Sequence, residues 1–428
     1  MLGALRSSIA RAGRAGFVRN VGVLAGGTAF AQGLVALSLP VLTRLYDPSD
    51  FSLLAVYIAV ISILGVVSCL RLNIAVPLPA DDADGMALTL LSLLAASGLS
   101  LLLGAIVFIW PDAVASLLGS PGIAGYLWMI PVGVWVASVY TALQYWASRK
   151  RRFTLITRTR MTRAIAGSGT QLGFGVIAQS GFGLLFGHMI YGGMGIVGLL
   201  MSVWRQDRAV LREVTALRLK GALSAYRRFP IWSVPEALFN TAGSQLPIIL
   251  IAGYLVGPEA GFLMLAMRIM GLPMGLIGSS VGQVYLAEAR DRKARGELAA
   301  FTRRTMWGLF VAGGPPLVLV GVLSPLLAGF VFGEDWARAG VLVAWMTPWF
   351  VLQFVTSPVS AILHVEGRLV LAMILQALGL LLRAGAVLAA LVWTPEIASE
   401  VFAVSGAVFY GVFMMVVYFV AGAGERAQ

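Results

Sequence analysis

Residues 21–42 read VGVLAGGTAFAQGLVALSLPVL, a run of 22 residues without a charged side chain. A membrane-spanning helix needs about 20 mostly apolar residues, so this run is long enough to cross a bilayer. Arginines precede it, and Ala29-Phe30-Ala31 resembles a signal-peptidase site. A signal peptide has a shorter apolar core, however, so the length favours an uncleaved first span. The run therefore predicts a membrane protein.

The rest of the chain repeats this pattern. Of its 428 residues, 59% are hydrophobic and 12% are charged, against about 45–50% and about 25% in soluble domains. This composition excludes a soluble enzyme, a disordered chain and a disulfide scaffold, and it predicts an all-α polytopic membrane protein. Twelve windows have the length and hydropathy of a span: residues 21–42, 51–70, 86–110, 122–146, 164–180, 182–203, 230–254, 260–284, 305–332, 340–362, 369–392 and 397–421.

The basic residues give an independent test of these windows. With the N-terminus in the cytoplasm, 27 of the 31 Lys and Arg residues fall on the cytoplasmic side. Arg44 and Arg338 fall outside, and Arg268 and Arg383 fall within spans. Cytoplasmic loops of membrane proteins are enriched in Lys and Arg, so this asymmetry predicts twelve spans with both termini in the cytoplasm. The basic runs also predict contacts with membrane lipids.

Six helices in each half suggest two related lobes. We expect a cytoplasmic segment at 1–20, an N-terminal six-helix lobe at 21–215, a C-terminal six-helix lobe at 216–421 and a cytoplasmic tail at 422–428. An even number of helices per lobe makes the lobes parallel, related by a pseudo-two-fold axis along the membrane normal. Several transporters have this plan and bind substrate between the repeats.

Several kinds of chemistry are excluded by the sequence. It contains one cysteine, Cys69, and two distant histidines, His188 and His364, so no metal site is expected. No phosphate-binding GxxxxGK[ST] motif occurs. The loops are too short for an extramembrane enzyme or nucleic-acid-binding domain. We therefore expect no catalytic residues and no cofactor, and the protein is predicted not to be an enzyme.

Polar residues inside spans are costly, so they are candidate functional residues. The seventh window contains PIWSVPEALFNTAGSQ at 230–245, in which Glu236, Asn240 and Ser244 recur every four residues. This spacing lines one face of a helix. Glu236 is a candidate for ion coupling, because burial would let it carry a proton or cation.

Four arginines are candidates for an anionic ligand. Arg268 and Arg383 lie within spans, whereas Arg44 and Arg71 lie near span ends. A guanidinium offers a forked set of donors that suits phosphate oxygens. An alternative explanation for Arg44 and Arg71 is that they extend to the bilayer interface.

Four segments resemble the polysaccharide biosynthesis proteins, the lipid-linked oligosaccharide flippases of the multidrug/oligosaccharidyl-lipid/polysaccharide exporter superfamily. They are LPVLTRLYDPSDF at 39–51, LRLNIAVPLP at 70–79, PMGLIGSSVGQVY at 273–285, and SPVSAIL at 357–363 followed by Glu366-Gly367-Arg368. The chain departs from the family's pattern at Ser52, where glycine is usual, and at Leu72 and Asn73.

The resemblance implies a flippase of the bacterial inner membrane. It would turn undecaprenyl-diphosphate-linked oligosaccharide repeats from the cytoplasmic to the periplasmic leaflet by alternating access, for O-antigen, lipopolysaccharide or exopolysaccharide. We expect a monomer that cooperates with polysaccharide polymerase and chain-length proteins. The expected substrate-binding residues are Arg44, Arg71, Asn240, Gln245, Arg268, Gln283 and Arg383.

Three alternatives stay open. A drug/cation antiporter of the same superfamily would need several intramembrane carboxylates, and the spans offer only Glu236. A peptidoglycan-precursor flippase would share the diphosphate-lipid substrate. A scaffold that organises polysaccharide assembly without transport is the alternative from another functional class.

Overall fold

The computed structural model describes residues 26–178 and 180–426, and in these ranges the chain folds into helices with no β-strand. This confirms the predicted all-α class. The predicted cytoplasmic segment 1–20 and the last two residues of the predicted tail lie outside the described ranges. Residues 422–426 continue the final helix, α19 (Ala398–Arg426).

Ten helices of the described chain are long and apolar enough to cross a membrane, and they correspond to ten of the twelve predicted windows. The windows at 122–146 and 164–180 correspond to α6 (Met129–Arg149) and α7 (Phe153–Ile177). These helices have 21 and 25 residues, enough for about 30 Å of hydrocarbon, but they are more polar. The count of twelve spans and the pseudo-symmetry stay predictions.

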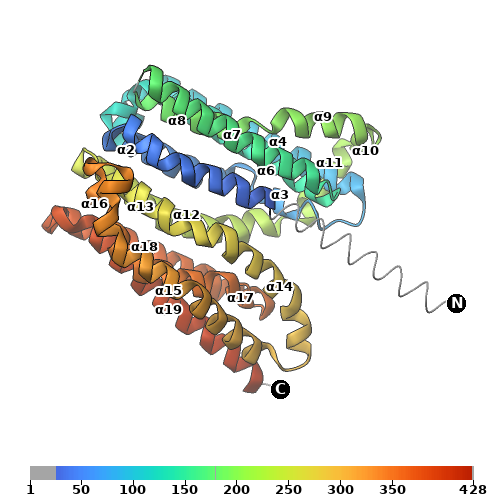
Figure 1. The fold of residues 1–428 in the computed structure, drawn as a ribbon. Helices are drawn as coiled ribbons and strands as arrows, with labels where there is room; N and C mark the ends of the chain where they lie inside the picture. Colours follow the sequence, from blue (N-terminus) through green and yellow to red (C-terminus); the bar gives the residue numbers. More distant parts are fainter. Residues whose placement is uncertain (1–25, 179, 427–428) are drawn as a thin grey trace.

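The helices form two neighbouring groups, which Figure 1 shows as the blue-to-green and yellow-to-red parts of the bundle. The first-half helices are Gly26–Leu45, α2 (Pro48–Ser68), α3 (Leu72–Ala75), α4 (Asp82–Ile109), α5 (Pro111–Leu117), α6, α7, α8 (Gly181–Gly193), α9 (Ile196–Gln206), α10 (Arg208–Arg212) and α11 (Ala216–Ala225). The second-half helices are α12 (Val234–Leu255), α13 (Glu259–Pro273), α14 (Ser279–Ala294), α15 (Leu298–Phe332), α16 (Ala337–Thr356), α17 (Ile362–Val365), α18 (Leu369–Trp393) and α19. Helix α2 packs against α12 and α13 and so joins the two groups.

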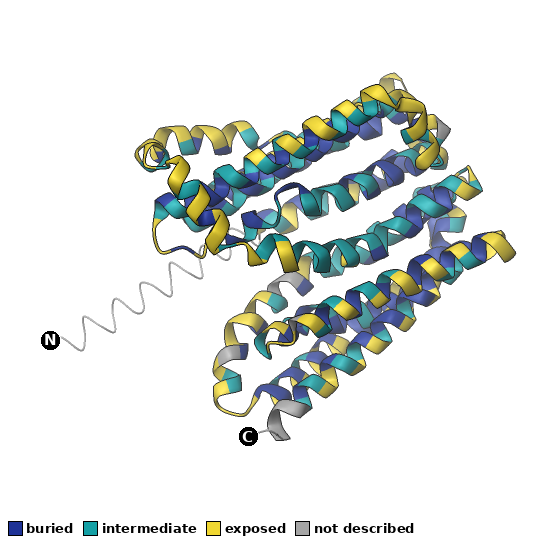
Figure 2. Ribbon diagram, turned by 180° about the vertical axis from the view of Figure 1, so that it is seen from behind, coloured by how far each residue is buried: buried dark blue, intermediate teal, exposed yellow. Residues whose placement is uncertain are grey.

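The outer faces of the bundle are apolar. Leu326, Phe330 and Leu381 are among many large apolar side chains that are exposed there, and exposed residues follow the outward sides of the helices in Figure 2. A soluble protein rarely exposes so much apolar surface, whereas lipid covers it at no cost. The exposed surface thus fits a bilayer.

Helix α7 begins eleven residues before the predicted window, so Arg158, Arg160 and Arg163 lie in the helix and not in a loop. Arg160 donates a 2.7 Å hydrogen bond to Thr28, and the Arg163 guanidinium stacks 3.8 Å from the Tyr140 ring centroid. Arginine is a good helix former. Hydropathy excluded this segment because it counts each charge as exposed, although the Arg160 and Arg163 side chains have partners within the fold.

Two other predicted windows are interrupted. The window at 182–203 bends at Met194 and Gly195, between α8 and α9. The window at 260–284 breaks where α13 ends at Pro273, and a π-helical turn, Met274–Gly278, leads into the charged helix α14. Proline has no N–H to donate, which disrupts the regular helical hydrogen bonds at this point.

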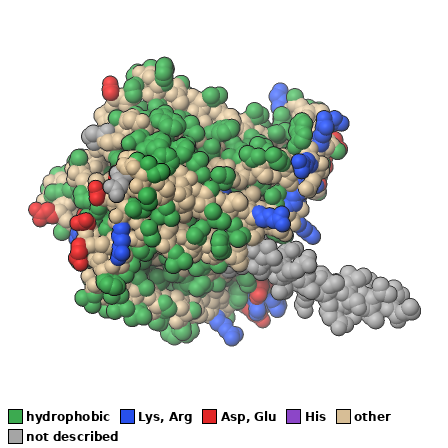
Figure 3. All heavy atoms as spheres, turned by 45° about the horizontal axis from the view of Figure 1, so that its top comes forward, with side chains coloured by type: hydrophobic (Ala, Val, Ile, Leu, Met, Phe, Trp, Pro, Cys, Tyr) green, Lys and Arg blue, Asp and Glu red, His purple; other side chains and the backbone are tan. Residues whose placement is uncertain are grey.

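Charge is distributed unevenly along the bundle. Basic side chains gather at the end that carries the α6–α7 turn and α9, on the right in Figure 3, and acidic side chains gather at the opposite end. We call these the basic end and the acidic end. The acidic end contains Asp112, Glu334, Asp335 and Glu396. Which end faces the cytoplasm stays a prediction from the positive-inside rule.

Candidate functional site

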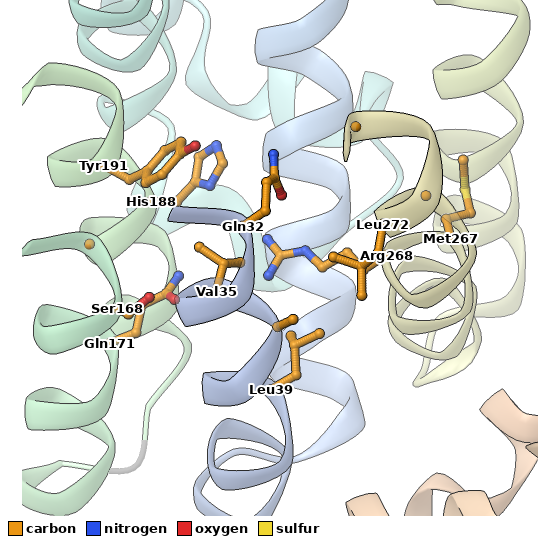
Figure 4. Close-up of a pocket in the computed structure, with 14 residues that line it drawn as sticks. Gln32, Val35, Leu39, Ser168, Gln171, His188, Tyr191, Met267, Arg268 and Leu272 are labelled. Carbon is orange, nitrogen blue, oxygen red and sulfur yellow. The ribbon is translucent and has the colours of Figure 1, made fainter. Parts of the chain in front are cut away.

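A cavity of about 290 Å³ lies between the first-half and second-half helices. The helix Gly26–Leu45, α7 and α8 line one side, and α13 and its π-helical turn line the other (Figure 4). The polar side chains at the cavity are Gln32, Ser168, Gln171, His188, Tyr191 and Arg268. The site is thus formed by segments that are far apart in the sequence.

Arg268 is the one cation that lines this cavity, and none of the described lining residues is Asp or Glu. Its guanidinium extends towards Gln32 and Val35 in Figure 4. Among the described residues, none forms a hydrogen bond or ion pair with its side chain. Arg268 is nine residues from the start of α13, about 14 Å along the axis, so the charge lies near the middle of a bilayer about 30 Å thick. The cavity therefore favours an anion.

Neutral polar groups face Arg268 across the cavity. The Gln171 side-chain amide donates a 3.0 Å hydrogen bond to the Leu184 carbonyl, which leaves its own oxygen as an acceptor. His188 stacks on Tyr191 with ring centroids 6.0 Å apart. Arg163 lies behind Tyr191, with its guanidinium 4.6 Å from that ring. Such a wall can donate and accept hydrogen bonds, as a sugar ligand requires.

The sequence predicted Arg268 but not Gln32, Ser168, Gln171 or Tyr191 as site residues. A weak signal was available, because Ser168 and Gln171 lie three residues apart on one face of α7. Their meeting with Gln32 depends on how the helices pack, which no single-helix pattern contains.

A second group of predicted residues lies at the basic end. Leu70 and Arg71 both have positive φ, 49° and 58°, a conformation that is strained for residues other than glycine. It directs Arg71 towards the second-half helices, where its Nε lies 3.4 Å from Ser233 Oγ. Burial lowers the pKa of Arg71, and the nearby Tyr145 and Glu236 side chains oppose this shift.

Glu236 pairs with a histidine and does not line the cavity. Its Oε1 lies 3.4 Å from His364 Nε2 on α17. Both side chains are partly exposed, at 24% and 48%. This places a pair of titratable groups beside Arg71 at the basic end, close to the surface.

The remaining predicted binding residues lie elsewhere. Asn240 and Gln283 are exposed and Gln245 is half-buried. Arg44 is exposed and donates a 3.2 Å hydrogen bond to the Phe330 carbonyl. None of these four lines the cavity around Arg268, and their roles in binding stay predictions.

Arg383 is 1% exposed and lies among the second-half helices. Its Nε donates to the Gly379 carbonyl at 3.0 Å, and its guanidinium lies 4.5 Å from the Phe409 ring centroid. Its Nη2 has no hydrogen-bond partner in the described structure. The side chain reaches neither the cavity around Arg268 nor the surface, so its predicted contact with substrate would need a rearrangement of these helices.

The acidic end of the bundle is closed. Ser52 Oγ donates to the Gly257 carbonyl at 2.7 Å and accepts from the Gly261 N–H at 2.9 Å. Gly119 and Gly253 approach closely: a Cβ at Gly119 would collide with the Gly253 backbone, and a Cβ at Gly253 would lie 3.2 Å from Gly119 Cα. These contacts join first-half and second-half helices. Ser52, where the family usually has glycine, therefore helps to hold the two groups together.

Comparison with known protein families shows which family this chain belongs to. The model of the family described as polysaccharide biosynthesis protein matches residues 41–340. The chain belongs to the polysaccharide biosynthesis protein family. Among curated protein sequences, none matches it.

Several solved structures of other proteins have a fold similar to that of this polysaccharide biosynthesis protein. It is similar to the lipid II flippase MurJ in an inward closed conformation, with a TM-score of 0.67, 14% identity, and coverage of 92% of this chain and 86% of that one. It is also similar to an inward-facing MATE multidrug resistance transporter of the MOP superfamily, with a TM-score of 0.62, 15% identity, and coverage of 93% and 96%. The eukaryotic MATE transporter AtDTX14 gives a TM-score of 0.58 at 14% identity and coverage of 96% and 99%. These matches confirm the predicted transporter fold.

Proposed function

We propose that this protein is a flippase for undecaprenyl-diphosphate-linked oligosaccharide repeats. It would move them from the cytoplasmic to the periplasmic leaflet of a bacterial inner membrane by alternating access, for assembly of a surface polysaccharide such as O-antigen or exopolysaccharide. The observation that carries the proposal is the charge of the cavity, in which unpaired Arg268 is accompanied by neutral hydrogen-bonding groups and no carboxylate among the described residues.

The diphosphate would bind to Arg268, because a guanidinium binds phosphate oxygens through two parallel charge-assisted hydrogen bonds. Gln32, Gln171 and Tyr191 would contact the sugars, and the polyprenyl chain would stay in lipid. The step forms and breaks no covalent bond, so no enzyme chemistry is proposed. A drug/cation antiporter is disfavoured, since a cation would meet Arg268 without a compensating acid.

The closed acidic end supports a state in which the cavity is shut off from that side. Release of the substrate at the acidic end would require the hydrogen bonds of Ser52 with Gly257 and Gly261 to break. The Glu236–His364 pair is the proposed site of ion coupling, because it lies close to the contact between Arg71 and Ser233, where first-half and second-half helices meet.

Gene deletion in the host tests the proposal. We expect loss of surface polysaccharide together with accumulation of undecaprenyl-linked repeats inside the cell, both reversed by the wild-type gene. Peptidoglycan synthesis should be unaffected, which separates this substrate from the peptidoglycan precursor. Normal export without accumulation, in a strain that has no paralogue, would contradict the flippase proposal and leave a scaffold role.

A further inference from the structure

A second pocket lies at the basic end, outside the cavity of the proposed transport site. It has a volume of about 470 Å³ and lies between the start of α7 and the end of α9. Four arginines line it, together with the apolar side chains of Phe153, Leu155 and Met201. The four are Arg151, Arg152, Arg158 and Arg205.

Only one of these four charges is neutralised. Arg152 forms a salt bridge of 2.6 Å with the buried Asp207 and donates to Ser202. Arg151, Arg158 and Arg205 are exposed, and their guanidinium groups have no hydrogen-bond or ion-pair partner among the described residues. Three unpaired guanidiniums around one pocket favour an anionic ligand with several oxygen acceptors.

Two apolar grooves run from this basic pocket along the two sides of α9. One, of about 660 Å³, lies between α9 and the helices α6, α7 and α8, and it shares Leu155, Arg158 and Gly198 with the basic pocket. The other, of about 650 Å³, lies between α9 and the helices α4 and α6, and it shares Met201 and Arg205. The basic pocket therefore continues into an apolar groove on each side.

The exposed face of α9 indicates that this region contacts lipid. Val197, Leu200, Met201 and Trp204 are exposed and recur at the spacing of one helical face. The Arg208 guanidinium stacks 5.1 Å from the Trp204 ring centroid. Tryptophan and arginine together are typical of the boundary between acyl chains and headgroups. At that depth, a lipid can place its headgroup at the arginines and its chains in the grooves.

We propose that this region is a binding site for one anionic phospholipid of the surrounding membrane. The phosphate contacts Arg151, Arg158 and Arg205, and the two acyl chains occupy the two grooves beside α9. The positive charge of the pocket matches the negative charge of the phosphate. The two grooves, one for each acyl chain, favour a two-chain phospholipid over a single-chain polyprenyl lipid. Basic pockets between membrane helices commonly bind anionic headgroups in this way. The site is separate from Arg268 and does not depend on the proposed transport function.

Native mass spectrometry of the purified full-length protein tests the site. The probes are phosphatidylglycerol and phosphatidylcholine with the same acyl chains. We expect wild type to retain one phosphatidylglycerol more strongly than phosphatidylcholine. The triple variant R151Q/R158Q/R205Q should lose phosphatidylglycerol affinity by about tenfold or more. Arg152 is left intact because its salt bridge to Asp207 holds α9 in place.

A matched control neutralises three exposed arginines at the same end but outside the pocket, as R212Q/R227Q/R295Q. It should bind phosphatidylglycerol as wild type does, and so should R268Q. Gly198→Phe fills one groove without a change of charge and should also weaken phosphatidylglycerol binding, because the Gly198 Cβ position has only Thr159 nearby, at 3.9 Å.

Four outcomes would overturn the proposal. The pocket triple variant could retain phosphatidylglycerol, or the control triple could lose it equally. Inorganic phosphate could displace the lipid completely, which would show a site for a free anion. Undecaprenyl diphosphate could displace it at lower concentration than phosphatidylglycerol itself, which would assign the pocket to the transported lipid class.

Discussion

The indole Nε1 of Trp336 donates a 2.8 Å hydrogen bond to the carbonyl of Thr43, although the two residues are 293 positions apart. Trp336 is 1% exposed. Its ring packs edge-on against Phe51 of α2 at 4.7 Å and against Phe262 of α13 at 5.8 Å. One side chain thus joins first-half and second-half helices at the acidic end, which would have to open in the proposed alternating-access mechanism.

Trp336→Phe keeps an aromatic ring but removes the hydrogen-bond donor. Loss of one net hydrogen bond corresponds to about 1 kcal/mol, or about fivefold in the population of the open state. We expect an impermeant thiol reagent added from the acidic-end side to modify a cysteine at Ala36, which lines the cavity, about fivefold faster. Trp345→Phe, which alters an exposed tryptophan, is the control. Equal rates in both variants would show that Trp336 does not hold this end closed.

The close approach of Gly243 to Arg383 predicts a coupling between the two positions. A Cβ at residue 243 would collide with Arg383 Nη2 and would lie 3.2 Å from the backbone of Leu380. Gly243→Ala should therefore lower the free energy of unfolding, by about 1–3 kcal/mol. The loss should be smaller in an Arg383→Met background, where the colliding group is absent. Thermal melts monitored by size-exclusion chromatography measure both effects, with Gly385→Ala as a control in open space. If Gly243→Ala lowers the free energy of unfolding by the same amount in both backgrounds, the predicted contact between residues 243 and 383 is contradicted.

The membrane topology can be tested with single cysteines. Asp112 and Glu334 are exposed at the acidic end, and Lys220 is exposed on α11 at the basic end. We expect an impermeant reagent to label cysteines at 112 and 334 in intact cells and to label position 220 only after lysis. Cys69 is buried, so the wild-type chain gives the background. Labelling of position 220 from outside would reverse the predicted orientation.

Ion coupling through Glu236 can be separated from substrate binding. Glu236→Gln removes the charge but keeps a hydrogen-bonding group opposite His364. We expect transport driven by a proton or sodium gradient to fall to the rate measured without the gradient, while binding of the substrate is unchanged. The measurement compares flux with and without each gradient in reconstituted liposomes. A gradient effect that persists in Glu236→Gln would place coupling elsewhere.

The sequence alone predicted the membrane class, ten of the spans and Arg268 as a charge within a span, because hydropathy and the cost of a buried charge act residue by residue. It could not distinguish Arg268 from Arg383, since both are single arginines in apolar helices. Their environments differ because of the neighbouring helices. Arg268 lines the cavity, whereas Arg383 packs against Gly243 and Phe409. The early start of α7 was missed for the same reason, because the partners of Arg160 and Arg163 come from other helices.

The central claim is that the cavity around Arg268 carries an anionic lipid-linked sugar across the bilayer. Its most direct test uses purified protein in liposomes that contain a fluorescent undecaprenyl-diphosphate-linked oligosaccharide, with an impermeant quencher reporting the fraction in the outer leaflet. We expect the wild-type protein to translocate the lipid faster than empty liposomes do. Arg268→Gln should slow this rate by about tenfold or more, since a hydrogen bond to a charged group contributes about 1.5–3 kcal/mol, and Arg268→Lys should be intermediate. Translocation by Arg268→Gln at the wild-type rate, or by wild type at the rate of empty liposomes, would contradict the account.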